Sequence, residues 1–372
     1  MAENTGPVAD PPEPDSEQQA IDEFERRPST MPDIGIDLRN FATEEQANSV
    51  GREVLGILHA LGKILNLKRL AQVIVAWDYN DAFANLDRGT EVSRQLAATD
   101  DGIAVGIAMT PKVLRDGEPR AVMVLNAAYM SVLTGCDTPD AEAIRERIFN
   151  TLAHEGAHVH DLDVQASTLP GVILKTQFPF RDGILFAIAS GCWEEYIACR
   201  LTAWMGKEWT VRDFEDTFCK SLERARGRAN AAIRQYRMHA DITRLTNEVC
   251  EEYKKVMVYA SYLLGHIDGL DRTVEEAAPR AIETIEKHTY FETFFKRLQT
   301  ELRVLHSTYG AWTGLDVFEP LKHLADDVLK DGGIDIQARS DGSAYVNIPF
   351  TPDTMPSPEE QRAFMLAKRA GQ

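Results

Sequence analysis

The pattern His154-Glu155-Gly-Ala-His158 restricts this chain more than any other part of its sequence. In an α-helix, residues four positions apart lie on the same face, so both imidazoles can reach one metal ion. Zinc at hydrolytic sites takes three protein ligands and keeps a fourth position for water, and a neighbouring carboxylate can accept a proton from that water. The pattern therefore predicts one Zn²⁺ per chain on His154 and His158, with Glu155 as general base.

The residues before this pattern support a helix there. Thr138-Pro139 is typical of an N-cap followed by proline at the first helical position. Ile144, Ile148 and Leu152 then recur every four residues, as on one apolar helix face. We therefore expect the two histidines on a regular helix. The alternative is a metal with a purely structural role.

Composition and charge exclude several classes of function. The 372 residues are 44% hydrophobic and 26% charged, which is enough for a sizeable core. The net charge of −18 argues against a nucleic-acid partner, because phosphate binding needs clustered Lys and Arg. No long apolar run and no secretory leader are evident, so we expect no membrane association and a cytoplasmic protein. The five irregularly spaced cysteines are expected to be reduced and buried.

The segment before the pattern divides into a leader, a helix and strands. Residues 1–35 are rich in Pro, Glu, Asp and Gln and predict a disordered acidic leader. Residues 43–62 carry an apolar stripe at helical spacing. Three short runs with strand character follow, over residues 70–77, 102–109 and 120–126.

Two features of these runs concern the sheet. Asp116-Gly117 lies between the second and third runs and is typical of a hairpin turn. The strand at 121–126 either lies at a sheet edge, where it can pair with an extended peptide, or is an interior core strand. The sequence favours neither position.

The segment after the pattern contains a second helix with two carboxylates. Residues 163–180 predict a loop long enough to act as a lid. Residues 184–205 predict an apolar helix that contains Glu194 and Glu195. Carboxylates are rarely buried without a partner. Either this pair is solvated or bound to cations such as Arg200, or one of the two binds the metal.

Glu195-Tyr-Ile-Ala198 resembles the E-x-x-A stretch of small gluzincins of the ImmA/IrrE type, which are zinc metallopeptidases. The order of helix, strands, H-E-x-x-H helix and glutamate helix over residues 43–206 is also similar to the thermolysin-like group. The resemblance implies a zincin-like fold, a peptide or protein substrate, and Glu195, in preference to Glu194, as third zinc ligand. Those families often place Asp or Asn four residues after the glutamate to hold a ligand histidine. This sequence has Cys199 there, with Asp161 as a candidate substitute.

The remaining sequence is helical and then closes with strands. Residues 207–332 predict a helical region, and residues 333–372 predict a hairpin followed by a polar tail. Tyr196, Tyr236 and His239 are candidates for the group that stabilises an oxyanion.

These patterns predict an α+β, mainly helical protein with a small β-sheet and a helical C-terminal extension, and the resemblance implies that its core is zincin-like. The expected parts are the leader (1–35), the catalytic core (36–206), the helical region (207–332), and the hairpin with its tail (333–372). The expected function is hydrolysis of peptide bonds, with Zn²⁺ on His154, His158 and Glu195 and with Glu155 as base. The alternatives are a catalytically silent zinc-containing regulatory or binding protein and an amidase of non-peptide substrates.

Overall fold

The computed structural model describes residues 16–90, 106–135 and 140–370. Its helices are α1 (Ser16–Arg26), α2 (Glu44–Leu61), α3 (Tyr79–Ala84), α4 (Ala127–Met130), α5 (Ala141–Thr168), α6 (Phe180–Thr202), α7 (Glu208–His239), α8 (Ile242–Gly269), α9 (Val274–Ala277), α10 (Pro279–Lys287), α11 (Glu292–Ser307), α12 (Glu319–Asp331) and α13 (Pro358–Ala370). Short 3-10 helices cover Ser131–Thr134, Ala203–Met205, Thr289–Phe291, Leu315–Phe318 and Pro352–Thr354. The strands are β1 (Ile36–Arg39), β2 (Leu70–Ala76), β3 (Ala108–Met109), β4 (Lys112–Arg115), β5 (Glu118–Asn126), β6 (Asp335–Ala338) and β7 (Ala344–Asn347).

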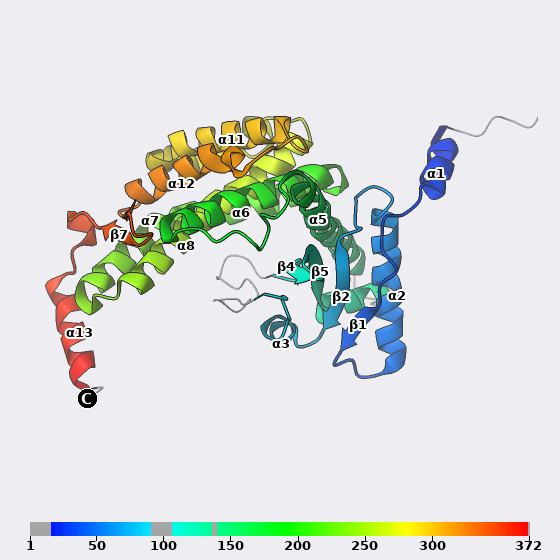
Figure 1. The fold of residues 1–372 in the computed structure, drawn as a ribbon, viewed down its shortest axis with the longest axis horizontal. Helices are drawn as coiled ribbons and strands as arrows, with labels where there is room; N and C mark the ends of the chain where they lie inside the picture. The colour runs from blue at the N-terminus through cyan, green and yellow to red at the C-terminus, as the bar shows by residue number, and fades with distance from the viewer. Residues whose placement is uncertain (1–15, 91–105, 136–139, 371–372) are drawn as a thin grey trace, which may run out of the picture.

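Helices dominate and accompany one small mixed sheet, which confirms the mainly helical α+β class. In Figure 1 the sheet and α2 occupy one side of the molecule, and the helical layer with α6, α7, α8, α11 and α12 occupies the other. The helix α5 lies between these two parts and contributes to the core around the sheet. In the described ranges, no helix combines the length and the apolar character that a bilayer-spanning segment needs.

The sheet has the order β1-β2-β5-β3, and β4 also pairs with β5. The strands β1, β2 and β5 are parallel, whereas β3 and β4 run antiparallel to β5. Alternate residues face opposite sides: Val73 and Val75 pack with α2 and α5, whereas Ile74 and Ala76 pack against α3. Since β5 has neighbours on both sides, the alternative that placed it at a sheet edge is wrong.

The hairpin turn at Asp116-Gly117 is confirmed, with φ of 52° and 75° at these two residues. The strand that it joins to β5 is β4, however, and not the predicted run at 102–109. Only the end of that run forms a strand, as β3, and residues 102–105 lie outside the described ranges. A four-residue strand with one buried side chain leaves little periodic signal, which explains why β4 was not predicted.

The prediction that residues 1–35 are disordered is wrong for residues 16–35. Residues 16–26 form α1, where the Phe24 ring lies 5.1 Å from the Lys63 ammonium group. The Thr30 hydroxyl contacts the carbonyl oxygens of Gly62 and Leu65 and accepts a hydrogen bond from the amide of Leu67. A polar segment is thus ordered by hydrogen bonds to the loop after α2, and composition does not report these bonds. Residues 1–15 lie outside the described ranges.

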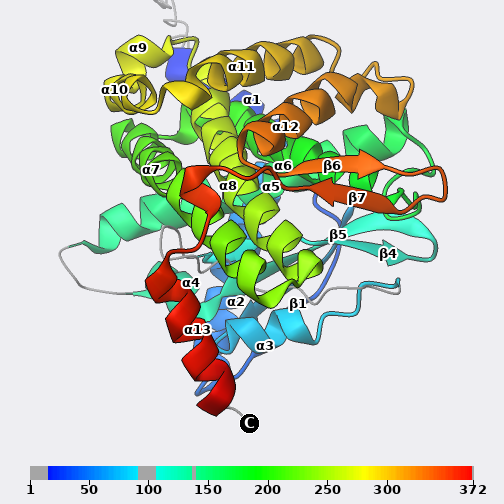
Figure 2. The same ribbon diagram turned by 90° about the vertical axis from the view of Figure 1, so that its left-hand side faces the viewer.

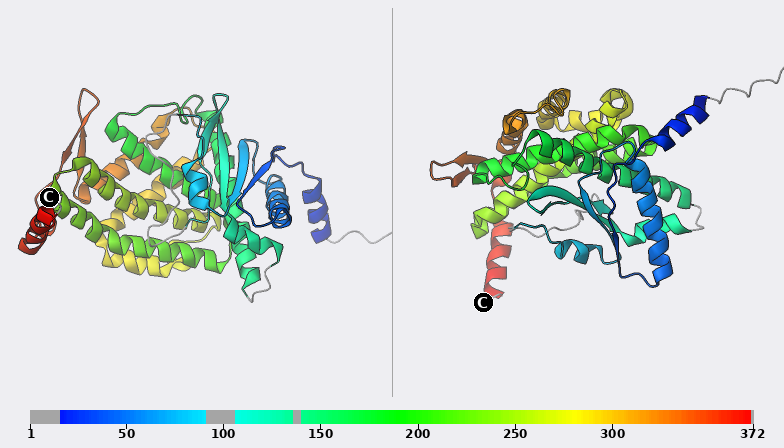
Figure 3. Two further views of the ribbon diagram at one scale, coloured as in Figure 1. Left: turned by 90° about the horizontal axis from the view of Figure 1, so that it is seen from below. Right: turned by 45° about the vertical axis from the view of Figure 1, so that its right-hand side comes forward.

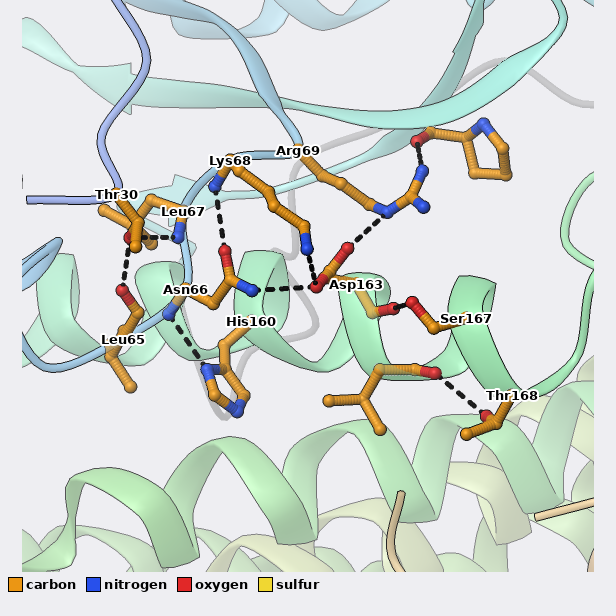
Figure 4. A network of polar contacts seen from close by, with 12 residues as sticks. Thr30, Leu65, Asn66, Leu67, Lys68, Arg69, His160, Asp163, Ser167 and Thr168 are labelled. Atoms are coloured by element: carbon orange, nitrogen blue, oxygen red, sulfur yellow. Dashed lines mark hydrogen bonds and ion pairs between the residues drawn. The ribbon is translucent and has the colours of Figure 1, made fainter. Parts of the chain in front are cut away.

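The helix that carries the H-E-x-x-H pattern is longer than predicted. It runs from Ala141 to Thr168, and the predicted cap at Thr138-Pro139 lies outside the described ranges. The predicted loop at 163–180 is therefore wrong over its first six residues. The extension is held by Asp163, whose carboxylate binds the guanidinium of Arg69 at 2.8 Å and the ammonium group of Lys68 at 2.9 Å (Figure 4). It also accepts a hydrogen bond from the Asn66 amide, while the Asn66 backbone N–H donates to His160 Nδ1.

We expect Asp163→Ala to lower the free energy of unfolding by about 3 kcal/mol, because it leaves a largely buried Arg69 without its carboxylate. The Asp163 side chain is 7% exposed and that of Arg69 16%. Urea unfolding followed by circular dichroism measures the change. The control is Glu118→Ala, which removes a 62% exposed carboxylate 3.8 Å from the same arginine and should cost below about 1 kcal/mol. Equal losses in both variants would contradict this role.

The predicted boundary at residue 206 does not separate two cores. The helix α6 lies before that residue, yet its Ile188, Trp193 and Ile197 share one core cluster with α7, α8, α11 and α12. The predicted C-terminal hairpin is confirmed as β6 and β7, and it stands beside α12 in Figure 2. The tail after it is helical, as α13, which lies at the opposite end of the molecule from α1 (Figure 3).

Candidate metal centre

Two helices bring together the three side chains predicted to bind zinc. His154 and His158 lie one turn apart on α5, and their Nε2 atoms are 3.1 Å from each other. Glu195 projects from α6, with its Oε2 atom 3.1 Å from His154 Nε2 and 3.4 Å from His158 Nε2. Among the described residues, this is the one group of three His, Cys, Asp or Glu side chains close enough to share a metal ion. The geometry of the predicted triad is therefore present.

The two adjacent glutamates of α6 have different partners. Glu195 contacts both histidines, whereas Glu194 pairs through its Oε1 atom with Lys112 Nζ on β4 at 2.7 Å. Arg200, considered as a partner for this pair, lies 3.5 Å from Asp268 instead. The preference for Glu195 over Glu194 thus agrees with the geometry, since adjacent residues point about 100° apart around a helix.

Glu155 is held beside this group by a threonine. Glu155 as a whole is 6% exposed, and its carboxylate accepts a hydrogen bond of 2.7 Å from the Thr110 hydroxyl. Thr110 lies between β3 and β4, so the edge of the sheet closes over α5 at this point. Sequence reasoning missed Thr110 because no motif marks it.

His154 is supported on its other side by two groups from different helices. Its Nδ1 atom lies 3.7 Å from the sulfur of Cys199, so the thiol occupies the place of the Asp or Asn expected from the resemblance. The Tyr262 ring from α8 stacks on the imidazole with centroids 5.5 Å apart. Asp161 does not serve as the suggested substitute, because its carboxylate accepts hydrogen bonds from Gln165 and Trp193.

None of the three residues considered for oxyanion stabilisation lines the cavity beside the triad. Tyr196 donates a hydrogen bond to Asp268, and Tyr236 packs with His239 at the end of α7. Tyr262 does line this cavity. Burial, followed by the charge of Glu195, raises the pKa of the Tyr262 phenol well above its ordinary value. In the sequence, Tyr262 is one member of a helical stripe, which carries no catalytic signal.

The triad opens into a cavity of about 770 Å³. One wall is the segment from Gly106 to Lys112, and the others are formed by α5, α6, α7 and α8, with Arg88 and Leu174 also lining the cavity. A cavity of this volume is within the range that protein ligand sites occupy. The candidate metal centre is therefore accessible to a ligand from one side.

Comparisons with protein-family models, curated proteins and solved structures give no match. The case for a metal site accordingly depends on the residues and their geometry.

The electrostatics of the triad favour a positive charge between its members. Burial acts to lower the pKa of His158, but the carboxylates of Glu195, Glu155 and Glu194 outweigh it and raise this pKa to about 9. Burial acts to raise the pKa of Glu195, but the two histidines hold it well below its ordinary value. A proton or a metal cation can supply the charge that these carboxylates attract. The donor set therefore fits a divalent cation.

We expect zinc affinity to rise by roughly tenfold per pH unit between about pH 6 and about pH 8, because zinc must displace a proton from His158. The sign follows from the pKa of about 9, above the ordinary 6.5, which keeps His158 protonated in the metal-free protein over this range. For the same reason, the stability that protonated His158 contributes to the metal-free fold is present below pH 6.5 and lost as pH rises through about 9. Calorimetric titration in buffers of different ionisation enthalpy measures the proton released. A pH-independent affinity would contradict the assignment.

Proposed function

We propose that this protein is a zinc-dependent hydrolase that cleaves peptide bonds in a peptide or protein substrate, with a zincin-like arrangement of α5 and α6. The observation that supports this most strongly is the convergence of His154, His158 and Glu195, with the buried Glu155 beside them. Cys192, Cys199, Cys219 and Cys250 are free thiols, which suits a reducing compartment, so we place the activity in the cytoplasm.

Zn²⁺ would be held by His154, His158 and Glu195, and when bound it supplies a Lewis acid that makes water a better nucleophile. Glu155 accepts the proton of the attacking water and passes it to the leaving amine. The hydrogen bond from Thr110 keeps the Glu155 carboxylate in one orientation while it does so. Tyr262 lies in the same cavity with its hydroxyl protonated, and its hydrogen bond with Glu195 helps to orient that ligand.

Removal and return of the metal test this function. We expect the purified protein to contain one zinc per chain and to cleave unstructured peptides, because the triad offers one three-ligand site. Dialysis against a chelator should abolish cleavage, and one equivalent of Zn²⁺ should restore it, as followed by mass spectrometry of the products. Stoichiometric zinc without cleavage of any peptide in a broad panel would favour the regulatory alternative.

A further inference from the structure

The cavity extends well beyond the metal centre, and the lining residues of α6 and α8 show how far it extends. On α6 the cavity lining runs from Glu195 back to Ala187, and on α8 it runs from Tyr262 past Lys254 to Glu251. Ala187 and Lys254 each lie eight residues, or about 12 Å along a helix axis, from the residue of their helix that is next to the triad. An extended peptide covers that length with three or four residues. The cavity can therefore accommodate substrate residues on one side of the scissile bond.

The wall formed by α6 leaves room for a peptide. Its lining residues beyond the glutamates are Gly191, Ser190 and Ala187, all with small side chains. A Cβ atom at Gly191 would lie 3.5 Å from Lys254 Cε, so the stem of this lysine packs against the glycine. Lys254 is thereby held at the wall of the cavity, about 12 Å along α8 from Tyr262.

The charged groups of this cavity differ in whether they have partners. Glu194 pairs with Lys112, Glu195 contacts the histidines, and Glu155 binds Thr110. Glu251 and Lys255 also have interaction partners. Among the described residues, however, no carboxylate lies within ion-pair distance of Lys254 or Arg88.

Arg88 is, after Lys254, the second cation of this cavity with no described carboxylate within ion-pair distance. Its backbone carbonyl accepts a hydrogen bond from the amide of Leu114, which fixes its position beside β4. The guanidinium is half-buried, and its Nε atom is buried without a hydrogen-bond partner among the described residues. Burial lowers the pKa of Arg88, and no neighbouring carboxylate offsets this effect. A partly buried guanidinium without a counter-ion gains most from an anionic ligand.

We propose that Arg88 and Lys254 bind a carboxylate of the substrate, so that this cavity selects peptides with an acidic group three or four residues from the scissile bond. The group is either an Asp or Glu side chain or the C-terminal carboxylate of the peptide. Both sources offer the same planar anion to the guanidinium and the ammonium group. This inference rests on the proposed function for the position of the scissile bond.

Direct binding tests the inference without turnover. The full-length Glu155→Gln variant, loaded with zinc, is titrated with fluorescein-labelled octapeptides of Gly, Ala and Ser that carry a single Asp or Asn at each position in turn. Each peptide is prepared with a C-terminal acid and with a C-terminal amide, which separates a side-chain carboxylate from a terminal one. We expect one placement of the carboxylate to bind about tenfold more tightly than its carboxamide match.

Substitutions on the same background identify the groups responsible. Lys254→Gln and Arg88→Gln should each remove most of the carboxylate preference, while Lys296→Gln, which alters an exposed lysine of α11, should preserve it. Lys254→Glu should shift the preference toward peptides with Lys in place of Asp. Circular dichroism and urea unfolding check that each variant folds, and Lys254→Gln alone decides the outcome should Arg88→Gln not fold.

The results separate this inference from the proposed function. Equal binding of carboxylate and carboxamide peptides, no binding of any peptide at about millimolar concentration, or full preference in both Gln variants would overturn the inference. Cleavage by the unsubstituted protein without any such preference would leave the proposed function intact. A carboxylate preference without cleavage of any peptide would support the inferred carboxylate-binding site but refute the proposed hydrolase function.

Discussion

Glu155→Gln is expected to reduce kcat/KM for peptide cleavage by about 10³-fold, because it removes the base that accepts the proton of the attacking water. The amide keeps the shape of the side chain and can still accept the hydrogen bond from Thr110. Zinc content should therefore stay at one per chain, since Glu155 is not in the triad. Rates are measured with a quenched fluorescent peptide and metal by atomic emission.

The matched control for this prediction is Glu142→Gln, which makes the same chemical change on the same helix. Glu142 is exposed in the first turn of α5 and is not a lining residue of the cavity. The kcat/KM of the Glu142→Gln variant should equal that of the unsubstituted protein. Full activity in Glu155→Gln would remove the general base from the mechanism, and loss of zinc in that variant would show that the effect is on metal binding.

Glu195→Gln is expected to weaken zinc binding by at least about a hundredfold, because it replaces a charged ligand by a neutral amide between two imidazoles. Glu194→Gln provides a control one residue away. It breaks the ion pair with Lys112 but leaves the Glu195 carboxylate within 3.4 Å of both histidines. Its zinc affinity should stay within about tenfold of the unsubstituted protein. Competition with a chromophoric chelator measures both constants.

This pair of variants is informative because the sequence left two candidates for the third ligand. Loss of zinc in Glu194→Gln with retention in Glu195→Gln would reverse the assignment. Equal, small effects in both would mean that neither carboxylate completes the site. The metal-free Glu195→Gln protein should unfold at a lower temperature near neutral pH than the metal-free unsubstituted protein, because it lacks the carboxylate that contacts protonated His158. Circular dichroism therefore checks that each variant is folded at the temperature of the zinc titration.

Helix ends and tight turns could be predicted from the sequence, because they depend on residues that are neighbours in the chain. The Thr43 side chain caps α2 by accepting a hydrogen bond from the Gln46 amide, and Gly62 ends that helix, so the helix fills the range 43–62 over which the apolar stripe was recognised. The turn at Asp116-Gly117 needs positive φ at both residues, which Asp tolerates and Gly adopts freely. These signals involve neighbouring residues only, and so they can be recognised without the fold.

Long-range contacts explain the predictions that failed. Residues 16–35 and 163–168 are polar in composition, yet Thr30 and Asp163 order them through partners more than thirty residues away. Hydrogen bonds and ion pairs of this kind depend on which segments meet in space, and periodicity contains no information about that. The same holds for β5, whose interior place depends on both β2 and the short strands after residue 106.

The spacing of His154, Glu155 and His158 was enough to predict two imidazoles and a carboxylate around one cation, because a helix repeats every 3.6 residues. The side chains that contact this motif could be identified only in the folded chain. They are Thr110 between β3 and β4, Cys199 on α6 and Tyr262 on α8. These side chains contact the motif only when α5 packs against the sheet edge and both helices. The cations Arg88 and Lys254 reach one cavity for the same reason. Helical geometry is local, whereas the approach of separate elements depends on the packing of the whole core.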